Sequence, residues 1–352
     1  MTPTRHLHLD ASKRQPLLKD QESPNEDTMS LPVKSVLTDP KGSKNNEDAS
    51  IYFIGTATTV IEWQGIRILT DPNFLHTGDH VHLGPGMTAQ RKTNPAVDLH
   101  ELPAIDCVLL SHYHEDHFDQ LVEKSLNRTF DIITTPHAKE CLAGEAKEDP
   151  FQAVHDLDFF ESLMLHIDRK EPSHAGGYGK VPAIKVTGMP GKHVPPGPLA
   201  KANDLLKAVP PTNGWLLELG HSFKAPTGGD SEDIDTGYRI YISGDTLFVD
   251  ELKEIPSRLR GEKVDLMLVH LGGTTIPGPS MPLVMVTMDA EQGVKLMKLV
   301  NPEVTVPIHY DDYSVFLSPL SDFKEKVEEE GWGERVVYLE RGDQYQFKVG
   351  GG

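Results

Sequence analysis

The segment from Ser111 to Asp119 constrains the fold and chemistry of this chain more than any other part of it. It reads SHYHEDHFD and contains the pattern H-x-H-x-D-H, formed by His112, His114, Asp116 and His117. Imidazole nitrogens and carboxylate oxygens are ligands that zinc accepts in proteins. The segment directly follows an almost wholly apolar run, IDCVLLS at 105–111, which is typical of a buried strand. The pattern therefore predicts a metal site supported by the end of a rigid strand.

Three further potential ligands come where later predicted strands end. His193 follows the strand in 181–190, Asp245 ends the segment YRIYISGD, and His309 lies near the end of TVPIHY. Active sites in layered folds gather at one set of strand ends. A lone histidine after a strand is weak evidence of a ligand. The three residues together, in this order after the first segment, supply what a pair of metal ions would still need.

The rest of the chain predicts strands in runs, interrupted by helices. Residues 51–63 alternate and are rich in β-branched residues, and with 66–72 they predict a hairpin that turns at Gly65. A long loop over about 72–100 follows, dense in Gly, Pro and His. Further strands are predicted at 131–136, 214–220, 264–273 and, as a closing pair, 334–347, with a hairpin loop over 221–237. Helices are predicted at 119–126, 138–144, 288–300, with Asp289 as N-cap, and 323–331. This pattern favours sheets with helices outside, an α/β or α+β sandwich.

Composition excludes several classes of protein. The formal net charge of −19 opposes nucleic-acid binding through phosphate neutralisation. Two cysteines, Cys107 and Cys141, provide no disulfide framework. No apolar run approaches the ~20 residues that a membrane-spanning helix needs, and the first 20 residues lack the apolar core of a secretory signal. We therefore expect a cytoplasmic protein without a transmembrane segment, whose partner is a small-molecule substrate, with a homo-oligomer left open.

Residues 1–48 are polar and show little periodicity. They are rich in Lys, Asp, Glu, Ser, Pro and Asn, so they predict either a flexible N-terminal tail or a wrap along the edge of the domain, with the tail favoured. The domain itself is expected over 49–352.

Taken in order, these residues resemble the motifs of the metallo-β-lactamase-fold hydrolases. Those motifs are an early Asp after a strand, H-x-H-x-D-H, a His, a bridging Asp and a final His, and the first is matched here by Asp71. The resemblance covers about 51–345. It implies an α+β fold, a four-layer αβ/βα sandwich with the metals at one edge of the two sheets. It also implies the ligand sets, namely His112, His114 and His193 for one zinc, Asp116, His117 and His309 for the second, and Asp245 bridging both. Asp71 would hydrogen-bond near the histidine loop.

The resemblance also implies a chemistry. A hydroxide held between two zinc ions would attack the substrate, with Asp116 orienting it and passing its proton to the leaving group. Manganese or iron would suit the same ligands. The opening FIGTATTVIEWQGIRILTDP, the helix start at Met288 and the segment VPIHY are similar to the branch of ascorbate-6-phosphate lactonases and N-acyl phosphatidylethanolamine phospholipases D. We expect a lactone or related small carbonyl substrate. The alternatives are a phosphodiesterase, a mononuclear iron oxygenase on the same fold, and a non-catalytic binding protein.

Four residues near the predicted site have more than one interpretation. His270 follows a predicted buried strand and would either reach substrate as a catalytic residue or hydrogen-bond inside the sheet edge. Tyr310, beside His309, would either point into the cleft as a catalytic residue or pack in the core. A phosphodiesterase needs cations near its phosphate, and Arg91 and Lys92 are the nearest candidates.

Overall fold

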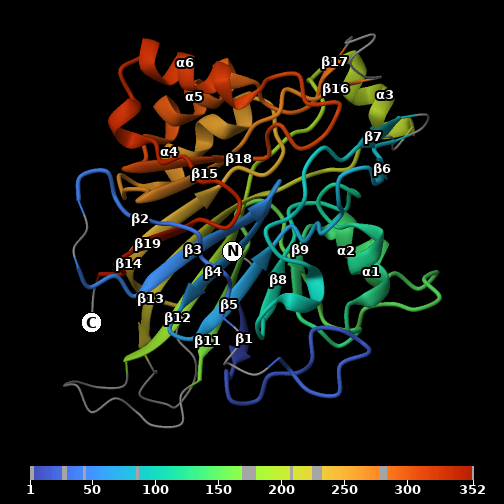
Figure 1. Cartoon of the computed structure of the whole chain (residues 1–352), viewed down its shortest axis with the longest axis vertical. Coiled ribbons are helices and arrows are strands. Elements are labelled where there is room, and N and C mark those ends of the chain that lie inside the picture. The colour runs from blue at the N-terminus through green and yellow to red at the C-terminus, as the bar shows by residue number, and fades with distance from the viewer. Residues whose placement is uncertain are drawn as a thin grey trace.

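Two large β-sheets face each other in the computed structural model of the chain (Figure 1). The structure describes residues 4–25, 30–42, 45–84, 87–168, 180–206, 209–223, 232–276 and 284–350. Within these ranges, the first sheet has eight strands, in the spatial order β10 (Val154–Asp156), β9 (Ile132–Thr134), β8 (Cys107–Leu109), β5 (Ile66–Thr70), β4 (Thr58–Trp63), β3 (Ala49–Gly55), β19 (Gln344–Phe347) and β2 (Val36–Leu37).

The second sheet has seven strands within the same described ranges. Their spatial order is β1 (Arg5–Leu9), β11 (Ser162–Ile167), β12 (Lys180–Met189), β13 (Gly214–Phe223), β14 (Ile234–Ile242), β15 (Leu266–His270) and β18 (Val304–Ile308). Two short hairpins stand apart from the sheets, β6 (His80–His82) with β7 (Thr88–Gln90) and β16 (Thr275–Ile276) with β17 (Val284–Met285).

Helices cover the outer face of each sheet, which gives four layers (Figure 1). On the eight-stranded sheet lie α1 (Gln120–Ser125) and α2 (Pro136–Ala143). On the seven-stranded sheet lie α4 (Glu254–Leu259), α5 (Ala290–Val300) and α6 (Leu320–Glu329), while α3 (Pro198–Leu206) lies near the short hairpins. Three 3-10 turns within the described residues complete the elements, η1 (Leu99–Glu101), η2 (Asp250–Lys253) and η3 (Gly333–Arg335).

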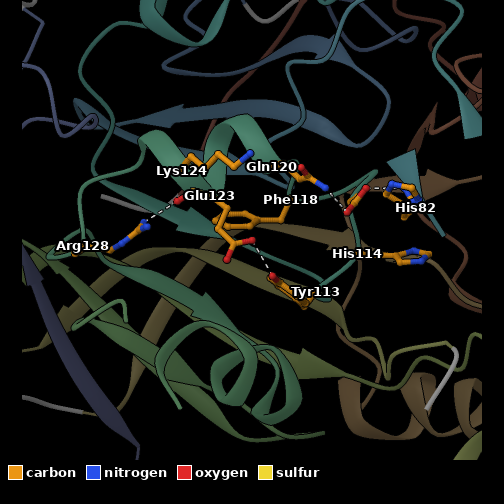
Figure 2. A pocket seen from close by; sticks show the side chains of 9 residues that line it. His82, Tyr113, His114, Phe118, Gln120, Glu123, Lys124 and Arg128 are labelled. Atoms are coloured by element: carbon orange, nitrogen blue, oxygen red, sulfur yellow. Dashed lines mark hydrogen bonds between the residues drawn. The ribbon is translucent and has the colours of Figure 1, made fainter. Parts of the chain in front are cut away.

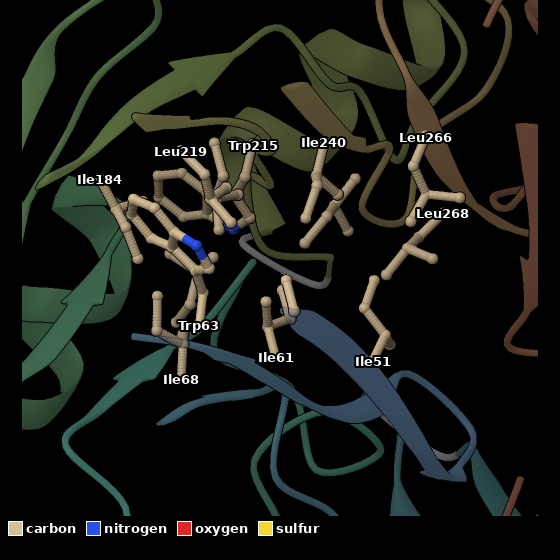
Figure 3. Close-up of a cluster of buried hydrophobic side chains, with 14 of the residues drawn as sticks. Ile51, Ile61, Trp63, Ile68, Ile184, Trp215, Leu219, Ile240, Leu266 and Leu268 are labelled. Carbon is tan, nitrogen blue, oxygen red and sulfur yellow. The ribbon is translucent and has the colours of Figure 1, made fainter. Parts of the chain in front are cut away.

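The main core fills the space between the two sheets (Figure 3). Ile51, Ile61 and Trp63 of the eight-stranded sheet face Trp215 and Ile240 of the other, and all five are at most 2% exposed. This inward row is the alternating set of apolar residues that predicted the strands. The α+β sandwich expected from the sequence is therefore confirmed.

The strand directions bring the ends that carry the candidate ligands to one edge of the sandwich. In the eight-stranded sheet β5 and β8 are parallel. In the seven-stranded sheet β14, β15 and β18 are parallel, and β12 shares their direction because both β12 and β14 are antiparallel to β13. Their carboxyl ends therefore meet on the same side of each sheet.

Two local predictions are corrected by turns. Residues 51–63 form two strands, because the chain reverses at Gly55 and Thr56, whose φ angles are 143° and 53°. The predicted turn at Gly65 does join β4 to β5, where Gln64 and Gly65 both have positive φ, as a tight hairpin requires. Residues 334–347 contain one strand, β19, after the 3-10 turn η3, instead of a strand pair.

The loop predicted over 221–237 is shorter than expected. Its two ends belong to paired strands, since β13 runs to Phe223 and β14 starts at Ile234, and the pairing of Ser222 with Ile234 extends the ladder. Residues 224–231 lie outside the described residues. The glycine, serine and charged residues here gave a loop signal that cross-strand pairing overrides at both ends.

The N-terminal segment is not a tail separate from the domain. Its residues 5–9 form β1, which pairs in parallel with β11, and residues 36–37 form β2, which pairs with β19. Leu17 and Leu18 are buried in the layer beneath α1, and Arg14 forms a buried ion pair with Asp106 at 2.9 Å. The described part of 1–48 thus follows the edge-wrap alternative, and the expected boundary at residue 49 does not separate packed from unpacked chain.

Candidate metal centre

The histidine loop is fixed between β8 and α1. Ser111 donates its backbone N–H to Asp71 Oδ1 at 2.6 Å, which ties the start of the loop to the end of β5. The loop turns where the backbone N–H groups of His117 and Phe118 donate to the carbonyl of His114 at 3.0 and 2.8 Å. Asp119 ends it as the N-cap of α1, accepting from Val122 N at 2.8 Å. The loop is therefore held at both ends and at its turn.

The structure brings the seven sequence-predicted ligands together in two groups. Within each group one ligand atom per residue lies within 4.8 Å of the others. The first group holds three imidazoles, from His112, His114 and His193, and the second holds Asp116, His117, Asp245 and His309. These sets coincide with the two sets that the family resemblance implies. Asp245 lies between them, since its Oδ2 is 3.2 Å from His117 Nε2 and 3.6 Å from His193 Nε2.

The imidazoles are held from behind through their Nδ1 atoms. His193 Nδ1 donates to the carbonyl of Val286 at 2.5 Å, and His309 Nδ1 donates to the carbonyl of Leu271 at 2.9 Å. A carbonyl only accepts, so the proton sits on Nδ1 and leaves Nε2 with a free lone pair. His117 Nδ1 lies 3.1 Å from Asp71 Oδ2. This is the arrangement in which a carboxylate or carbonyl orients a metal-binding histidine.

The opposite nitrogens form no hydrogen bonds with the described residues. Among the described residues, no hydrogen bond reaches the buried Nε2 atoms of His112, His114, His117, His193 and His309. Buried polar atoms are rarely left without a partner, because each costs about 1–3 kcal/mol. Five unpartnered imidazole nitrogens that converge on two carboxylates fit divalent metal ions, which none of the described side chains replaces.

Electrostatics at the centre fit the same interpretation. Burial lowers the pKa of His193 to about 4 and holds the pKa of His112 well below its ordinary value, so both imidazoles are neutral, as ligands must be. Burial acts to raise the pKa of Asp245, but His309 and His117 outweigh it and hold the pKa well below the usual range. Burial likewise acts against the charge of His117, yet Asp245 and Asp116 raise its pKa. The buried carboxylates thus attract positive charge, which bound cations would supply.

His270 does not face a substrate. It is fully buried, its backbone N–H donates to Ser243 Oγ at 2.9 Å, and its Nδ1 lies 3.0 Å from Asp245 Oδ1. Of the two interpretations of its role, the structure places it inside the sheet edge. His270 therefore holds Asp245, and the interpretation of His270 as a catalytic residue that reaches substrate is corrected.

Tyr310 is also corrected as a catalytic residue. Its side chain is buried among the residues beneath α5 and α6, and its hydroxyl donates to the carbonyl of Leu339 at 3.2 Å. The chain leaves β18 at His309, whose φ of 61° is left-handed, and after this turn the side chain of Tyr310 packs away from the ligand cluster. Tyr310 is a core residue of the seven-stranded sheet.

Sequence reasoning missed several residues that hold the site. Ser111 contacts the Nδ1 atoms of His112 and His117 at 2.9 and 3.4 Å, and Thr287 Oγ1 lies 3.5 Å from Asp245 Oδ2. Ser111 lies in the segment SHYHEDHFD, directly before His112, so its position in the sequence indicated a role beside the ligands. Thr287 comes from the segment before α5 and carried no signal in the sequence, because only the fold brings it to Asp245.

A narrow cavity of about 10 Å³, with room for about one water molecule, opens onto the ligands. Its walls are largely apolar, and the described lining residues include Leu83, Met87, Val209, Ile276 and Val286 but no lysine or arginine. Arg91, predicted as a candidate for phosphate, is 1% exposed and does not line this cavity, and Lys92 does not line it either.

A second, larger pocket shares His114 with the cavity (Figure 2). It lies over the start of α1, where Tyr113 donates to Glu123 at 2.7 Å and Gln120 donates to Glu115 at 2.7 Å. The polar side chains of this pocket are thus largely occupied with each other.

The fold and the site together define a metallo-β-lactamase-type protein, with a four-layer sandwich and a cluster of potential ligands at the edge of its sheets. The sequence model of the beta-lactamase superfamily domain matches residues 66–310, which is more than half of the chain. The chain therefore belongs to the beta-lactamase superfamily, as the motif order predicted. No helix in the part of the chain that the structure describes is long and apolar enough to cross a bilayer.

Three proteins are similar to this chain in sequence or in fold. A protein of Archaeoglobus fulgidus named metal-dependent hydrolase is 25% identical over 300 residues, covering 84% of this chain and 98% of that protein. The N-acyl-phosphatidylethanolamine-hydrolyzing phospholipase D 1 of Caenorhabditis elegans is 24% identical over 312 residues, covering 85% of this chain and 74% of that protein. The structure of an isothiocyanate hydrolase from Delia radicum gut bacteria has a TM-score of 0.61 at 18% identity, over 85% of this chain and 99% of that one. This last similarity shows the fold alone.

Proposed function

We propose that this chain is a metal-dependent hydrolase with two metal ions, zinc in the first instance and manganese or iron as alternatives, that cleaves a lactone or a related small ester. The observation that carries the proposal is the position of Asp245. Its Oδ2 atom approaches one ligand nitrogen of each group, at 3.2 and 3.6 Å. This supports the proposal that a single carboxylate serves both ions. The relatives named metal-dependent hydrolases support the reaction class.

Metal ions bound here would supply an activated water and a Lewis acid, which together suffice for ester hydrolysis without a protein nucleophile. The residues of the chain would orient the attacking water and transfer its proton. Asp116 lines the cavity, and no hydrogen bond from the described residues reaches its Oδ1. Its pKa is held well below the usual range, because His114 and His117 outweigh the opposing effect of burial. As an ionised carboxylate, Asp116 orients the attacking water, accepts its proton and returns it to the leaving group.

The walls of the cavity favour a neutral carbonyl substrate. Apolar side chains such as Leu83, Met87 and Val286 exclude water from the reacting bond. A phosphodiester carries a charge that usually draws arginine or lysine into the site, and the described lining residues provide neither. A lactone or similar ester needs no such cation.

A phosphodiesterase is the second candidate. The observation that favours it is the similarity to the Caenorhabditis elegans phospholipase D, which spans most of this chain. The metal ions themselves would then neutralise the phosphate.

The test combines metal content with turnover. Protein purified without added metal is analysed by mass spectrometry, and hydrolysis is measured on a panel of lactones and bis-aryl phosphate esters. We expect two metal ions per chain and faster hydrolysis of a lactone, lost by at least about 10²-fold in His114→Ala, because this histidine binds metal on our proposal. The matched control is His100→Ala, which changes an exposed histidine of η1 outside the ligand groups and outside both pockets and should retain activity.

Other outcomes discriminate between the alternatives. Faster hydrolysis of the phosphate esters would favour the phosphodiesterase. One iron per chain, with oxygen uptake and no hydrolysis, would favour the oxygenase. Absence of bound metal, even after zinc is added, would overturn the proposal and favour a binding protein.

A further inference from the structure

Arg91 is a buried cation that the proposed reaction does not use. It follows β7, its side chain is 1% exposed, and no carboxylate among the described residues pairs with it within 4 Å. Its partners are neutral, since Nε donates to the carbonyl of Thr93 at 2.9 Å and Nη1 donates to Asn73 Oδ1 at 3.2 Å and to Thr56 Oγ1. Its guanidinium also lies 5.1 Å from the ring centroid of Tyr313. Burying a charge against neutral acceptors is costly, so the geometry of these contacts needs a reason.

The contact between Arg91 and Asn73 leads to the histidine loop. Asn73 receives Arg91 on its Oδ1 and donates from Nδ2 to the backbone carbonyl of Glu115 at 3.1 Å. Glu115 is the residue between His114 and Asp116, one ligand from each group. Asn73 is itself fully buried and also donates to Tyr313 Oη at 2.8 Å. Arg91 therefore holds the Asn73 side chain, and Asn73 in turn holds the backbone of the histidine loop at Glu115.

The contact between Arg91 and Thr56 leads to His309. The backbone N–H of His309 donates to the carbonyl of Thr56 at 2.8 Å. Thr56 has a φ of 53° and His309 a φ of 61°. A β-branched residue in the left-handed region is strained by about 1–3 kcal/mol and persists only where its surroundings hold it. Thr56 is held by Arg91 on its hydroxyl and by Asp312 Oδ2 on its N–H at 3.0 Å.

We propose that Arg91 is a positioning residue for the metal centre, whose forked guanidinium fixes the histidine loop through Asn73 and His309 through Thr56. Both ligand groups then depend on one side chain that touches neither metal nor substrate. Arginine suits this role because Nε is anchored on the carbonyl of Thr93 while the two N–H groups of Nη1 reach acceptors on two different segments. Lysine lacks this planar anchor. The inference rests on the proposed metal centre.

The experiment compares Arg91→Lys with Arg14→Lys. Arg14 is the matched control, since it is also buried, at 6% side-chain exposure, and it pairs with Asp106 at the other end of β8 from the histidine loop. Zinc affinity is measured by competition with a chromophoric chelator, and the visible absorption spectrum is recorded on protein loaded with Co²⁺. We expect Arg91→Lys to bind zinc about 10–100-fold more weakly, as other changes behind metal ligands do, with an altered Co²⁺ spectrum. Arg14→Lys should lower stability but leave the affinity and the spectrum unchanged.

A second variant keeps the test decisive where Arg91→Lys does not fold. Asn73→Ala removes the link from Arg91 to Glu115, together with the contact to Tyr313, and keeps Arg91 itself. It should weaken zinc binding and alter the spectrum while the chain remains folded by circular dichroism. Wild-type affinity and spectrum in a folded Arg91→Lys, or in Asn73→Ala where the first variant is unfolded, would overturn the inference. An equal loss of affinity in Arg14→Lys would also overturn it, because the effect would then be one of general stability. A wild-type protein that binds no zinc would instead refute the proposed function.

Discussion

Single residues behind the ligands decide how firmly the centre is assembled, and His270 is the clearest case. It contacts Asp245 Oδ1 at 3.0 Å while Asp245 Oδ2 faces both ligand groups. We predict that His270→Ala lowers metal affinity about 10–100-fold and leaves KM for substrate unchanged, since His270 does not line the cavity. His270→Asn should recover most of the affinity, because an asparagine amide can donate from near the position of Nδ1. Equal losses in both variants would show that the hydrogen bond is not the cause.

Tyr310 provides the opposite expectation at the same scale. Its hydroxyl hydrogen-bonds the Leu339 carbonyl inside the core and is remote from the cavity lining. We predict that Tyr310→Phe lowers the free energy of unfolding by about 1 kcal/mol and leaves kcat, KM and metal content unchanged. Chemical denaturation and steady-state kinetics on one preparation check this. A fall in kcat with unchanged stability would restore the catalytic interpretation of Tyr310.

The ligands could be predicted from the sequence while their supporting residues could not, for a physical reason. A ligand residue can be recognised in the sequence by its chemistry and by its position at the end of a predicted strand, as Asp245 and His309 can. The role of a supporting residue depends on which way its side chain points, and the sequence pattern does not show this for a single side chain. The direction of Tyr310 depends on the left-handed φ of 61° at His309, just after the end of β18, which the sequence did not predict. The contacts of Asn73 and Thr56 were not predictable either, because they join segments far apart in the chain.

At the scale of elements, the N-terminal segment is the main difference between prediction and structure. Strand β1 is short and lies at the edge of its sheet, so its pattern is weak and its pairing with β11 is made entirely by distant residues. Short edge strands are specified by the sheet that receives them more than by their own sequence. The alternation of Leu7 and Leu9 in RHLHL was a signal, but five residues are too few to outweigh the polar composition around them.

The anchoring of β1 gives a pH-dependent prediction. Asp156, at the end of β10, accepts from Arg5 Nη1 of β1 at 3.2 Å and from Lys139 at 2.9 Å. Burial acts to raise the pKa of Asp156, but the hydrogen bonds from Lys139 and Arg5 outweigh it and lower the pKa below the ordinary 3.8. A carboxyl with a lowered folded pKa adds stability above its ordinary pKa, and this stability is lost as the pH falls through the folded value.

We therefore predict that Asp156→Asn is less stable than wild type at pH 7 and at pH 5, by no more than about 1 kcal/mol because the partners are partly exposed and screened by water. The difference should shrink as the pH falls below 3.8 towards the lowered value. Urea unfolding at pH 7, 5 and 3 measures it. A difference that stays constant down to the lowest pH would mean that charge is not the source of the stabilisation.

At the scale of the whole molecule, the candidate centre joins the two sheets. The histidine loop and Asp71 follow strands β8 and β5 of the eight-stranded sheet, while His193, Asp245 and His309 follow strands of the seven-stranded sheet. Each ligand group contains residues from both sheets. Bound metal would thus cross-link the edges of the sandwich, and metal binding and folding would be thermodynamically coupled.

We predict that removal of metal by a chelator lowers Tm, and that Tm rises again with added zinc in a concentration-dependent way. A ligand at 100 times its Kd stabilises the folded state by about 2.7 kcal/mol. Differential scanning calorimetry across a zinc series checks this. In His114→Ala the first group loses one of its three imidazoles, so the zinc-dependent part of Tm should shrink, whereas Tyr310→Phe should retain all of it. A Tm that is independent of zinc in wild-type protein with measured metal content would mean that the ions do not hold the two sheets together. The packing of the sandwich alone would then bring the ligands together. The large core between the sheets would offset the free-energy cost of burying nitrogens that lack hydrogen bonds.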